Sequence, residues 1–159
     1  MSLVPLLPLF HRFNREFFDG LLVRRSKAIV SIRWSDGRLT NTAGFYQRGP
    51  NLRCEKGAEI VLSRPVLINL PLQAIESTLC HEMIHAWVDL VLRVKEVHGA
   101  NFRARMKLIN SSQDRFQISV RHNFPLPKKP PKWVAKCYSC GLSLPYKRLV
   151  RGAACKRCC

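Results

Sequence analysis

The sequence predicts an α+β fold followed by a small zinc ribbon, and three features lead to this prediction. Short segments rich in isoleucine and valine follow an amphipathic N-terminal helix, a long helix is apolar on nearly every side, and two Cys-x2-Cys pairs lie near the C-terminus. The chain has 159 residues, of which 47% are hydrophobic. This is enough for one main domain with a small appendage, and it excludes a disordered chain.

Hydrophobic spacing and turn residues predict the elements of the N-terminal half. Apolar residues recur at helical spacing before the stop signal Asp19-Gly20, so a helix is expected over residues 6–18. Segments rich in β-branched residues, separated by turn-forming residues, predict strands over residues 27–34, 42–48 and 58–63. An antiparallel sheet is the economical arrangement of these three strands.

A second set of elements follows in the middle of the chain. Pro71 suits the first turn of a long helix over residues 72–92, and its apolar character on nearly every side predicts that it is buried. A further helix is expected over residues 100–110, and alternating residues predict a strand over 115–122.

A change in composition marks the boundary between two domains. The segment "FPLPKKPPKW" carries four prolines and three lysines, which predicts an extended linker over residues 125–132. The main domain is therefore expected over residues 1–124 and a cysteine-rich module over 133–159.

The charge of the chain predicts a polyanionic partner. There are 27 Lys and Arg residues against 10 Asp and Glu residues, a formal net charge of +17, and no acidic residue follows Asp114. Nucleic acid is the expected partner. The alternatives are that the positive charge binds an anionic membrane or only keeps the protein soluble. The apolar N-terminus lacks the basic region and cleavage site of a signal peptide, and no apolar run reaches the length of a membrane span. We therefore expect an intracellular monomer without a membrane partner.

The stretch "TLCHEMIHAW" carries the strongest signal for chemistry. His81 and His85 stand four residues apart, so on a helix both imidazoles can bind one zinc ion. Glu82 is rotated off that axis, where it can act as general base on a zinc-bound water. Burying these groups without partners would be costly, and a metal with its water supplies partners. The same argument holds for a structural zinc ion.

A catalytic zinc ion usually has a third protein ligand and one open position. The candidates in this sequence are His98, Glu96, Asp89, His11 and His122. Asp89 lies one turn beyond His85 and suits a supporting role better, and Glu96 lies close to the helix end. His98 is favoured, because Gly99 after it permits a sharp return of the chain.

The C-terminal cysteines have the spacing of a zinc ribbon. Cys137-x2-Cys140 and Cys155-x2-Cys158 are separated by fourteen residues, and each pair can supply two thiolates to a structural zinc ion. Cys159 is an alternative to Cys158 as the fourth ligand. Two disulfides in a secreted module are the competing interpretation. Cys54 and Cys80 are read as buried or incidental thiols.

Aromatic and basic residues alternate through this module and predict binding of single-stranded nucleic acid, whose backbone attracts cations and whose bases stack on rings. The expected DNA-binding residues are Tyr138, Tyr146, Lys147, Arg148, Arg151, Lys156 and Arg157. Trp133 is expected to pack inside the small module instead.

Several motifs in order resemble the SprT-like metalloprotease family, particularly its Spartan branch. They are "LFHRFNREFFDGLL", "EIVLSRPVL", "TLCHEMIHAW", "HGANFRARMKLIN" and "ISVRHNF". The resemblance implies a zincin-like α+β fold, zinc held by His81, His85 and His98, and Glu82 as general base. It also implies cleavage of proteins that are bound or crosslinked to DNA. The twelve residues between His85 and His98 are fewer than the family pattern suggests.

Three functions follow for testing. The first is a DNA-dependent zinc endopeptidase with one catalytic and one structural zinc ion, acting on single-stranded or disrupted DNA, in the nucleus of a eukaryote or the cytoplasm of a prokaryote. Its substrate would add to an exposed strand edge, formed by residues 58–63 or a neighbouring strand. The alternatives are a non-catalytic zinc-containing nucleic-acid-binding protein and a zinc peptidase that does not depend on DNA.

Overall fold

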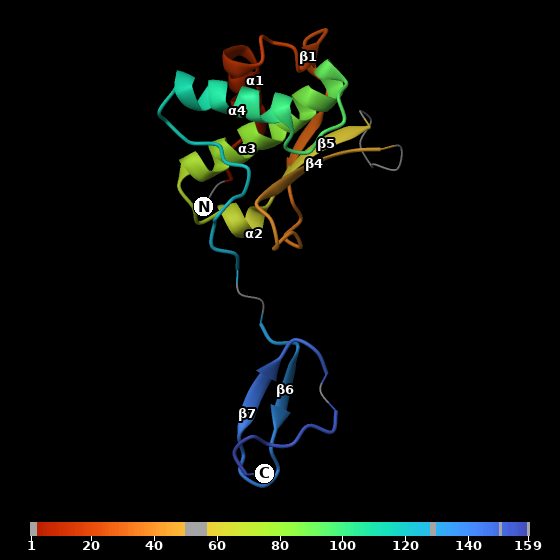
Figure 1. Cartoon of the computed structure of the whole chain (residues 1–159), viewed down its shortest axis with the longest axis vertical. Helices are drawn as coiled ribbons and strands as arrows, with labels where there is room; N and C mark the ends of the chain where they lie inside the picture. The colour runs from red at the N-terminus through yellow and green to blue at the C-terminus, as the bar shows by residue number, and fades with distance from the viewer. Residues whose placement is uncertain (1–2, 50–56, 128–129, 150, 159) are drawn as a thin grey trace. The chain divides into compact units, whose positions relative to one another are not determined.

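The computed structural model describes residues 3–49, 57–127, 130–149 and 151–158 (Figure 1). The chain divides into two compact units, Met1–Pro127 and Lys128–Cys159, with the division inside the segment 125–132. The first unit mixes helices and strands, and the second is built on a β-hairpin. None of the described helices is both long enough and apolar enough to cross a membrane.

The predicted N-terminal helix is confirmed as α1 (Leu6–Phe17). Its apolar face is buried in the core, with Phe10 and Phe13 fully covered. The buried Asn14 ends the helix, because its backbone carbonyl accepts hydrogen bonds from the backbone N–H groups of Phe18 and Gly20. Its side-chain oxygen accepts a further bond of 2.9 Å from the backbone N–H of Leu22. One residue therefore fixes how the chain leaves the helix.

The sheet contains β3 (Ser31–Trp34), β4 (Gly44–Arg48) and β5 (Ala58–Leu62) in the order β3-β5-β4. β4 pairs with β5 in antiparallel orientation, which confirms the expected pairing for these two strands, but β3 pairs with β5 in parallel. Along the chain β3, β4 and β5 alternate in direction, so β3 and β5 run the same way. Because β5 lies between β3 and β4 in the sheet, it pairs with β3 in parallel. Because β5 is central, its neighbour β4 provides a sheet edge and residues 58–63 do not.

Two short elements depart from the predicted pattern. The strand expected over residues 27–34 is divided into β2 (Lys27–Ala28) and β3, and β2 forms a two-residue hairpin with β1 (Val23–Arg24). A helix that the sequence analysis missed, α2 (Arg64–Leu67), follows β5. The Ser63 hydroxyl accepts a hydrogen bond of 3.2 Å from the backbone N–H of Val66, which is a common way to begin a helix.

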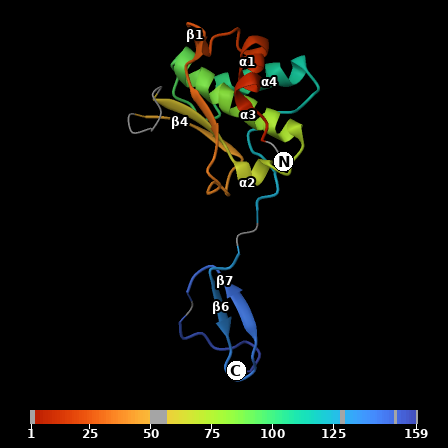
Figure 2. The same cartoon turned by 180° about the vertical axis from the view of Figure 1, so that it is seen from behind.

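The long helix forms the centre of the first unit. α3 (Leu72–Trp87) continues as a π-helical turn, η1 (Val88–Leu92), and the chain leaves it at Arg93 in the left-handed region, with φ at 58°. Figures 1 and 2 show α3 between the sheet and α4 (Ala100–Ser112), and α3 also contacts α1. Nearly every α3 residue is buried, as its apolar composition predicts.

The strand predicted over residues 115–122 is wrong, although the alternation that suggested it is real. Phe116 and Ile118 are buried, but this segment pairs with no described strand. The side chain of Asn110, on α4, instead bonds both the N–H and the C=O of Ile118, each at 2.8 Å. A side-chain amide thus replaces the partner strand that the pattern implied.

The second unit consists of the antiparallel pair β6 (Trp133–Lys136) and β7 (Ser143–Tyr146) and the chain that follows it. None of its described residues is buried. The expectation that Trp133 packs inside this unit was wrong, because 48% of its surface is exposed. Such a unit has no apolar core and needs another source of stability.

A glycine sets the distance between β4 and α3, which leads to the first prediction. A Cβ atom on Gly44 would lie 3.0 Å from Thr78 Cγ2 and 3.1 Å from the carbonyl oxygen of Val61. We expect Gly44→Ala to lower the free energy of unfolding by about 1–3 kcal/mol, as overpacking does. Urea unfolding of both proteins measures the difference.

The matched control is Gly49→Ala, since a Cβ atom there meets nothing within 4 Å. We expect this control to stay within about 0.5 kcal/mol of the parent protein. Equal stability of the Gly44→Ala variant would contradict the close approach of β4 to α3.

Candidate metal centre and cysteine cluster

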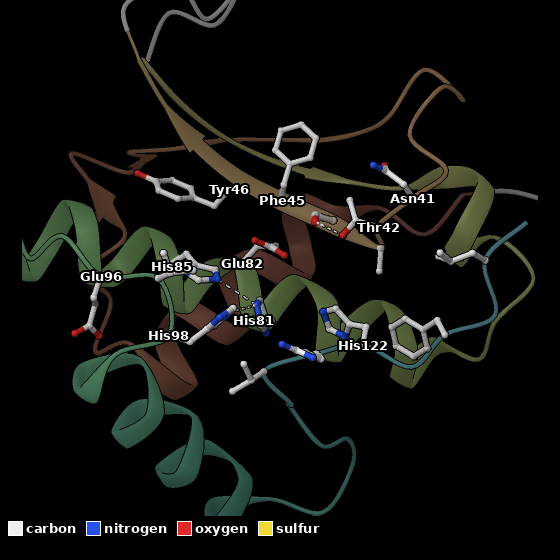
Figure 3. Close-up of a pocket in the computed structure, with 17 residues that line it drawn as sticks. Asn41, Thr42, Phe45, Tyr46, His81, Glu82, His85, Glu96, His98 and His122 are labelled. Carbon is white, nitrogen blue, oxygen red and sulfur yellow. Dashed lines mark hydrogen bonds between the residues drawn. The ribbon is translucent and has the colours of Figure 1, made fainter. Parts of the chain in front are cut away.

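Three imidazoles from two parts of the chain converge on one point. His81 and His85 lie one turn apart on α3, and His98 lies in the loop between η1 and α4 (Figure 3). The Nε2 atom of His81 is 3.2 Å from the Nε2 atoms of both His85 and His98. A tetrahedral zinc site with bonds of about 2.0 Å has edges of about 3.3 Å, so these nitrogens have a spacing that fits zinc.

The environment keeps the two helical histidines neutral, which is the form that binds a metal. Burial lowers the pKa of His81 to about 3 and that of His85 to about 4. His81 Nδ1 lies 2.9 Å from the carbonyl oxygen of Ser119, and only an N–H can be donated there. This hydrogen bond fixes the tautomer and leaves Nε2 free for a metal, an arrangement typical of histidine ligands.

Glu82 lies between the histidines and β4, where only 4% of its surface is exposed (Figure 3). Burial raises the pKa of its carboxyl group to about 8, while a hydrogen bond from the backbone N–H of Tyr46 acts in the opposite direction. A carboxylate in such a place can accept a proton near neutral pH. The Tyr46 amide is a functional group that the sequence analysis missed, because nothing in the sequence links it to Glu82.

The pairing of β4 explains why the Tyr46 amide is available. Gly49 N–H donates to the carbonyl of Gly57, and Ser63 N–H donates to the carbonyl of Ala43. These bonds set the phase of the ladder, so Gly44, Tyr46 and Arg48 direct their backbone groups away from β5. Among the described residues, no strand pairs with that edge.

The other candidates for the third ligand have different partners. Glu96 accepts hydrogen bonds from the backbone N–H of Phe102 at 2.7 Å and from the side chain of Asn101 at 3.2 Å, and so caps α4. Asp89 accepts a bond of 2.6 Å from the Tyr46 hydroxyl. That contact, after burial, contributes to raising the pKa of Tyr46 above its usual range. His11 lies on α1, where its ring packs edge-on against Phe10.

Gly99 has a different role from the one expected. Its φ of −77° is open to any residue, so no special turn is required. A Cβ atom there would lie 2.4 Å from Glu96 Oε2, within the carboxylate that caps α4. The glycine is therefore needed for close approach of Glu96 and not for a sharp return of the chain after His98.

A cavity of about 670 Å³ opens over these groups. β4 and the residues just before it form one wall, α3 contributes the histidines and Glu82, and the segment around His122 contributes another wall. His122 lies beside His81, on the side away from His85 and His98, with a ring centroid distance of 5.0 Å (Figure 3). Its Nε2 atom is buried and has no hydrogen-bond partner in residues 3–49, 57–127, 130–149 and 151–158.

Four cysteines form a second cluster, in the Lys128–Cys159 unit. The ligand atoms of Cys137, Cys140, Cys155 and Cys158 all lie within 4.8 Å of one another. The closest sulfur pairs are 3.5 and 3.6 Å apart, which is far from the disulfide bond length of about 2.05 Å and near the edge of about 3.8 Å for a zinc–thiolate tetrahedron. Backbone N–H groups of Cys140 and Ser139 lower the pKa of Cys137 to about 6, which favours the thiolate.

The remaining cysteine predictions have mixed outcomes. All four clustered cysteines and the buried Cys80 are free thiols, so the disulfide interpretation was wrong for this part of the chain. Cys158 takes the fourth position of the cluster. Cys159 and Cys54 lie outside the residues that the structure describes.

The predicted DNA-binding residues lie on the surface of the second unit. The side chain of Tyr138 is fully exposed and that of Tyr146 is half-buried. The five cations are all exposed, namely Lys147, Arg148, Arg151, Lys156 and Arg157. Trp133 stands opposite Tyr146 in the hairpin, which adds an exposed ring that the sequence analysis did not assign to binding.

Comparison with known proteins identifies relatives for the first unit. The family model described as "SprT-like family" matches residues 6–122. The chain is 33% identical over 120 residues to DNA-dependent metalloprotease dvc-1 of Caenorhabditis elegans, covering 73% of this chain and 30% of that protein. It is 37% identical over 119 residues to DNA-dependent metalloprotease SPRTN of Homo sapiens, covering 73% of this chain and 22% of that protein. The chain thus matches less than a third of the length of each of these relatives.

The two clusters predict two zinc ions per chain, and single substitutions should remove them separately. We expect His98→Ala to lose one zinc ion and Cys140→Ser to lose the other, as measured by elemental analysis of the purified protein. The Cys140→Ser substitution should also unfold the second unit, because no buried core holds that unit together.

The matched control for the histidine site is Glu96→Gln. It keeps the shape of the α4 cap and should retain both zinc ions, because the Glu96 oxygens bind Phe102 and Asn101. Loss of a zinc ion from the Glu96→Gln variant, with retention in His98→Ala, would show that Glu96 is the third ligand.

Proposed function

The chain belongs to the SprT-like family, and on this premise we propose that it is a zinc-dependent endopeptidase with a zincin-like site that cleaves proteins bound or crosslinked to DNA. The observation that carries the proposal is the buried carboxylate of Glu82 beside three convergent imidazoles, in a cavity bordered by a free strand edge. The printed names of the relatives, which are DNA-dependent metalloproteases, support the same activity.

The residues of the site divide the chemistry among them. A zinc ion held by His81, His85 and His98 would polarise a peptide carbonyl and lower the pKa of a water molecule. As the water oxygen adds to the carbonyl carbon, Glu82 accepts a proton from the water. Glu82 then delivers this proton to the leaving amine. The Tyr46 amide favours the charged form of the Glu82 carboxylate, because it lowers the pKa of that group. This is the arrangement of a general base beside a Lewis acid.

The free edge of β4 supports binding of an extended peptide. The Tyr46 N–H is bonded to Glu82 and the Gly44 carbonyl accepts from the Thr42 hydroxyl at 3.0 Å, while the Gly44 N–H and the Tyr46 carbonyl face the cavity side of the strand. A substrate strand would pair with these main-chain groups. Because main-chain pairing ignores side-chain identity, this mode suits an enzyme that acts on many different proteins.

Two groups of cations support a role for DNA. One group is the exposed set on the second unit, beside Tyr138 and Trp133. The other group lines a cavity of about 430 Å³ on the first unit, and consists of Arg24, Arg48, Arg93 and Lys95. Of these four, only Arg48 is paired with a carboxylate among the described residues. Unpaired cations around a cavity suit the phosphate groups of DNA. In a eukaryotic cell, DNA as the partner implies action in the nucleus.

Substitution of the general base tests the catalytic part of the proposal. We expect Glu82→Gln to reduce cleavage of a protein bound to single-stranded DNA by about 10²–10⁴-fold, because the amide cannot accept the proton. Zinc content and DNA affinity should not change. Gel analysis of the cleaved protein, together with elemental analysis, provides the measurement.

The matched control is Glu16→Gln, because Glu16 is an exposed residue of α1. This variant should cleave the protein normally. Undiminished cleavage by Glu82→Gln would overturn the assignment of the base. Absence of cleavage by the parent protein, with two zinc ions bound, would favour a non-catalytic nucleic-acid-binding protein.

The exposed ring of Tyr138 tests the DNA part of the proposal. We expect Tyr138→Ala to weaken binding of a single-stranded oligonucleotide by about 1–3 kcal/mol, the usual value for one stacked base, without a change in thermal stability. Fluorescence anisotropy at several salt concentrations measures the affinity. Cleavage that is equal with and without DNA, at low and high salt, would instead identify a peptidase that does not depend on DNA.

A further inference from the structure

The cavity over the candidate metal centre contains a buried polar atom without a hydrogen-bond partner among the residues that the structure describes. This atom is Nε2 of His122, which is covered by protein yet accepts or donates no hydrogen bond within the described part of the chain. Buried polar side-chain atoms are usually hydrogen-bonded, and an exception in a cavity indicates a missing partner. One ring nitrogen of His122, one of His81 and a carboxylate oxygen of Glu82 all lie within 4.8 Å of one another. The imidazole of His122 therefore lies beside the general base.

Other polar side chains that line the cavity are already engaged. The Tyr46 hydroxyl donates to Asp89 at 2.6 Å, and the Thr42 hydroxyl donates to the carbonyl of Gly44 at 3.0 Å. Glu96 is occupied in capping α4. His122 thus differs from these lining residues in having a buried nitrogen without a partner.

The position of His122 is fixed from both sides. The preceding segment is held by buried Ile118, whose backbone is bonded at both ends to Asn110. The imidazole stacks on the Phe124 ring with a centroid distance of 5.1 Å and an angle of 12° between the planes. A ring held in this way can present a donor at a defined place, which is what stabilisation of a transition state requires.

We propose that His122 is a further catalytic residue, whose Nε2–H donates a hydrogen bond to the oxygen of the peptide carbonyl under attack. The inference rests on the proposed peptidase function. As the water oxygen bonds to the carbonyl carbon, the π electron pair of the C=O bond moves to the carbonyl oxygen, and the water proton goes to Glu82. His122 stabilises the negative charge on that oxygen. The charge disappears when the C–N bond breaks and the amine takes the proton from Glu82.

The contacts of His122 differ from those of the three convergent histidines. His81 and His98 have their Nε2 atoms 3.2 Å apart, whereas no hydrogen-bonding contact joins His122 to His81 or Glu82 in the described part of the chain. A ring nitrogen of His122 lies within 4.8 Å of a carboxylate oxygen of Glu82 without a hydrogen bond between them, so a carbonyl oxygen bound beside Glu82 would lie close to this imidazole. Burial lowers the pKa of His122. In its neutral form the ring carries a single N–H, which one of its two nitrogens can donate.

Three variants of the full chain test the proposal. His122→Phe keeps an aromatic ring for Phe124 and removes the donor, whereas His122→Gln keeps an N–H near the position of Nε2. His11→Phe is the matched control, because His11 lies on α1 and does not line the cavity. Each variant is checked for zinc content and melting temperature before its kinetics are measured with a peptide substrate.

Two ligands separate charge stabilisation from ordinary binding. A phosphinic peptide carries a negative oxygen on a tetrahedral centre, and a reduced-amide peptide of the same sequence has no oxygen there. For His122→Phe we expect kcat to fall about 10²–10³-fold with little change in KM, the usual cost of losing one such donor. Affinity for the phosphinic peptide should fall by a similar factor, and affinity for the reduced amide should not change. His122→Gln should recover most of the loss.

Each other result has a definite meaning. Loss of zinc from the His122→Phe variant, or equal losses for both ligands, would overturn the proposal, since His122 would then bind metal or only shape the cavity. Unaltered phosphinic-peptide affinity in His122→Phe would overturn it as well. If the parent protein neither binds the phosphinic peptide nor cleaves the substrate, the proposed peptidase function has failed, which is a separate outcome from failure of the role of His122.

Discussion

The need to satisfy polar groups on a buried helix governs the architecture of the first unit. α3 is buried on almost every side, yet two of its buried side chains, those of His81 and Glu82, are polar. Each of these groups has a partner from a different element, the Ser119 carbonyl for His81 and the Tyr46 amide for Glu82. Without such partners the burial of these groups would cost several kcal/mol. The sheet edge and the segment after α4 are thus tied to the metal centre by hydrogen bonds.

Hydrophobic packing places those partners. Phe116 packs against Phe13 of α1 with a ring centroid distance of 5.4 Å, and Ile118 is buried beside it. These two anchors bring Ser119 and then His122 over α3. On the other side, Gly44 lets β4 approach α3 closely enough for the Tyr46 amide to reach Glu82. The core therefore does more than stabilise the fold, because it also positions groups that lie far apart in the sequence. The second unit follows the opposite principle, since none of its described residues is buried and it converges on four sulfur atoms.

Patterns whose meaning is local could be interpreted from the sequence, and patterns whose meaning depends on distant residues could not. The spacing of His81 and His85 and that of the cysteine pairs specify geometry within one helix or one turn, and the structure brings these residues together. The alternation over residues 115–122 correctly marked Phe116 and Ile118 as buried but gave the wrong partner, because a side-chain amide can replace a strand. Trp133 was assigned to a core that a unit of this size does not form.

The sequence by itself determined the three longer helices, α1, α3 and α4, the position of the His-Glu-x-x-His helix in the core, and the residues able to gather at each cluster, because these depend on composition and short-range spacing. Only the tertiary structure decided that β3 and β5 are parallel, that β4 carries the free edge, that Glu96 caps a helix, and that His122 lies beside Glu82. These facts depend on which segments meet in space. Such meetings are settled by the packing of the whole core, and no short stretch of sequence records them.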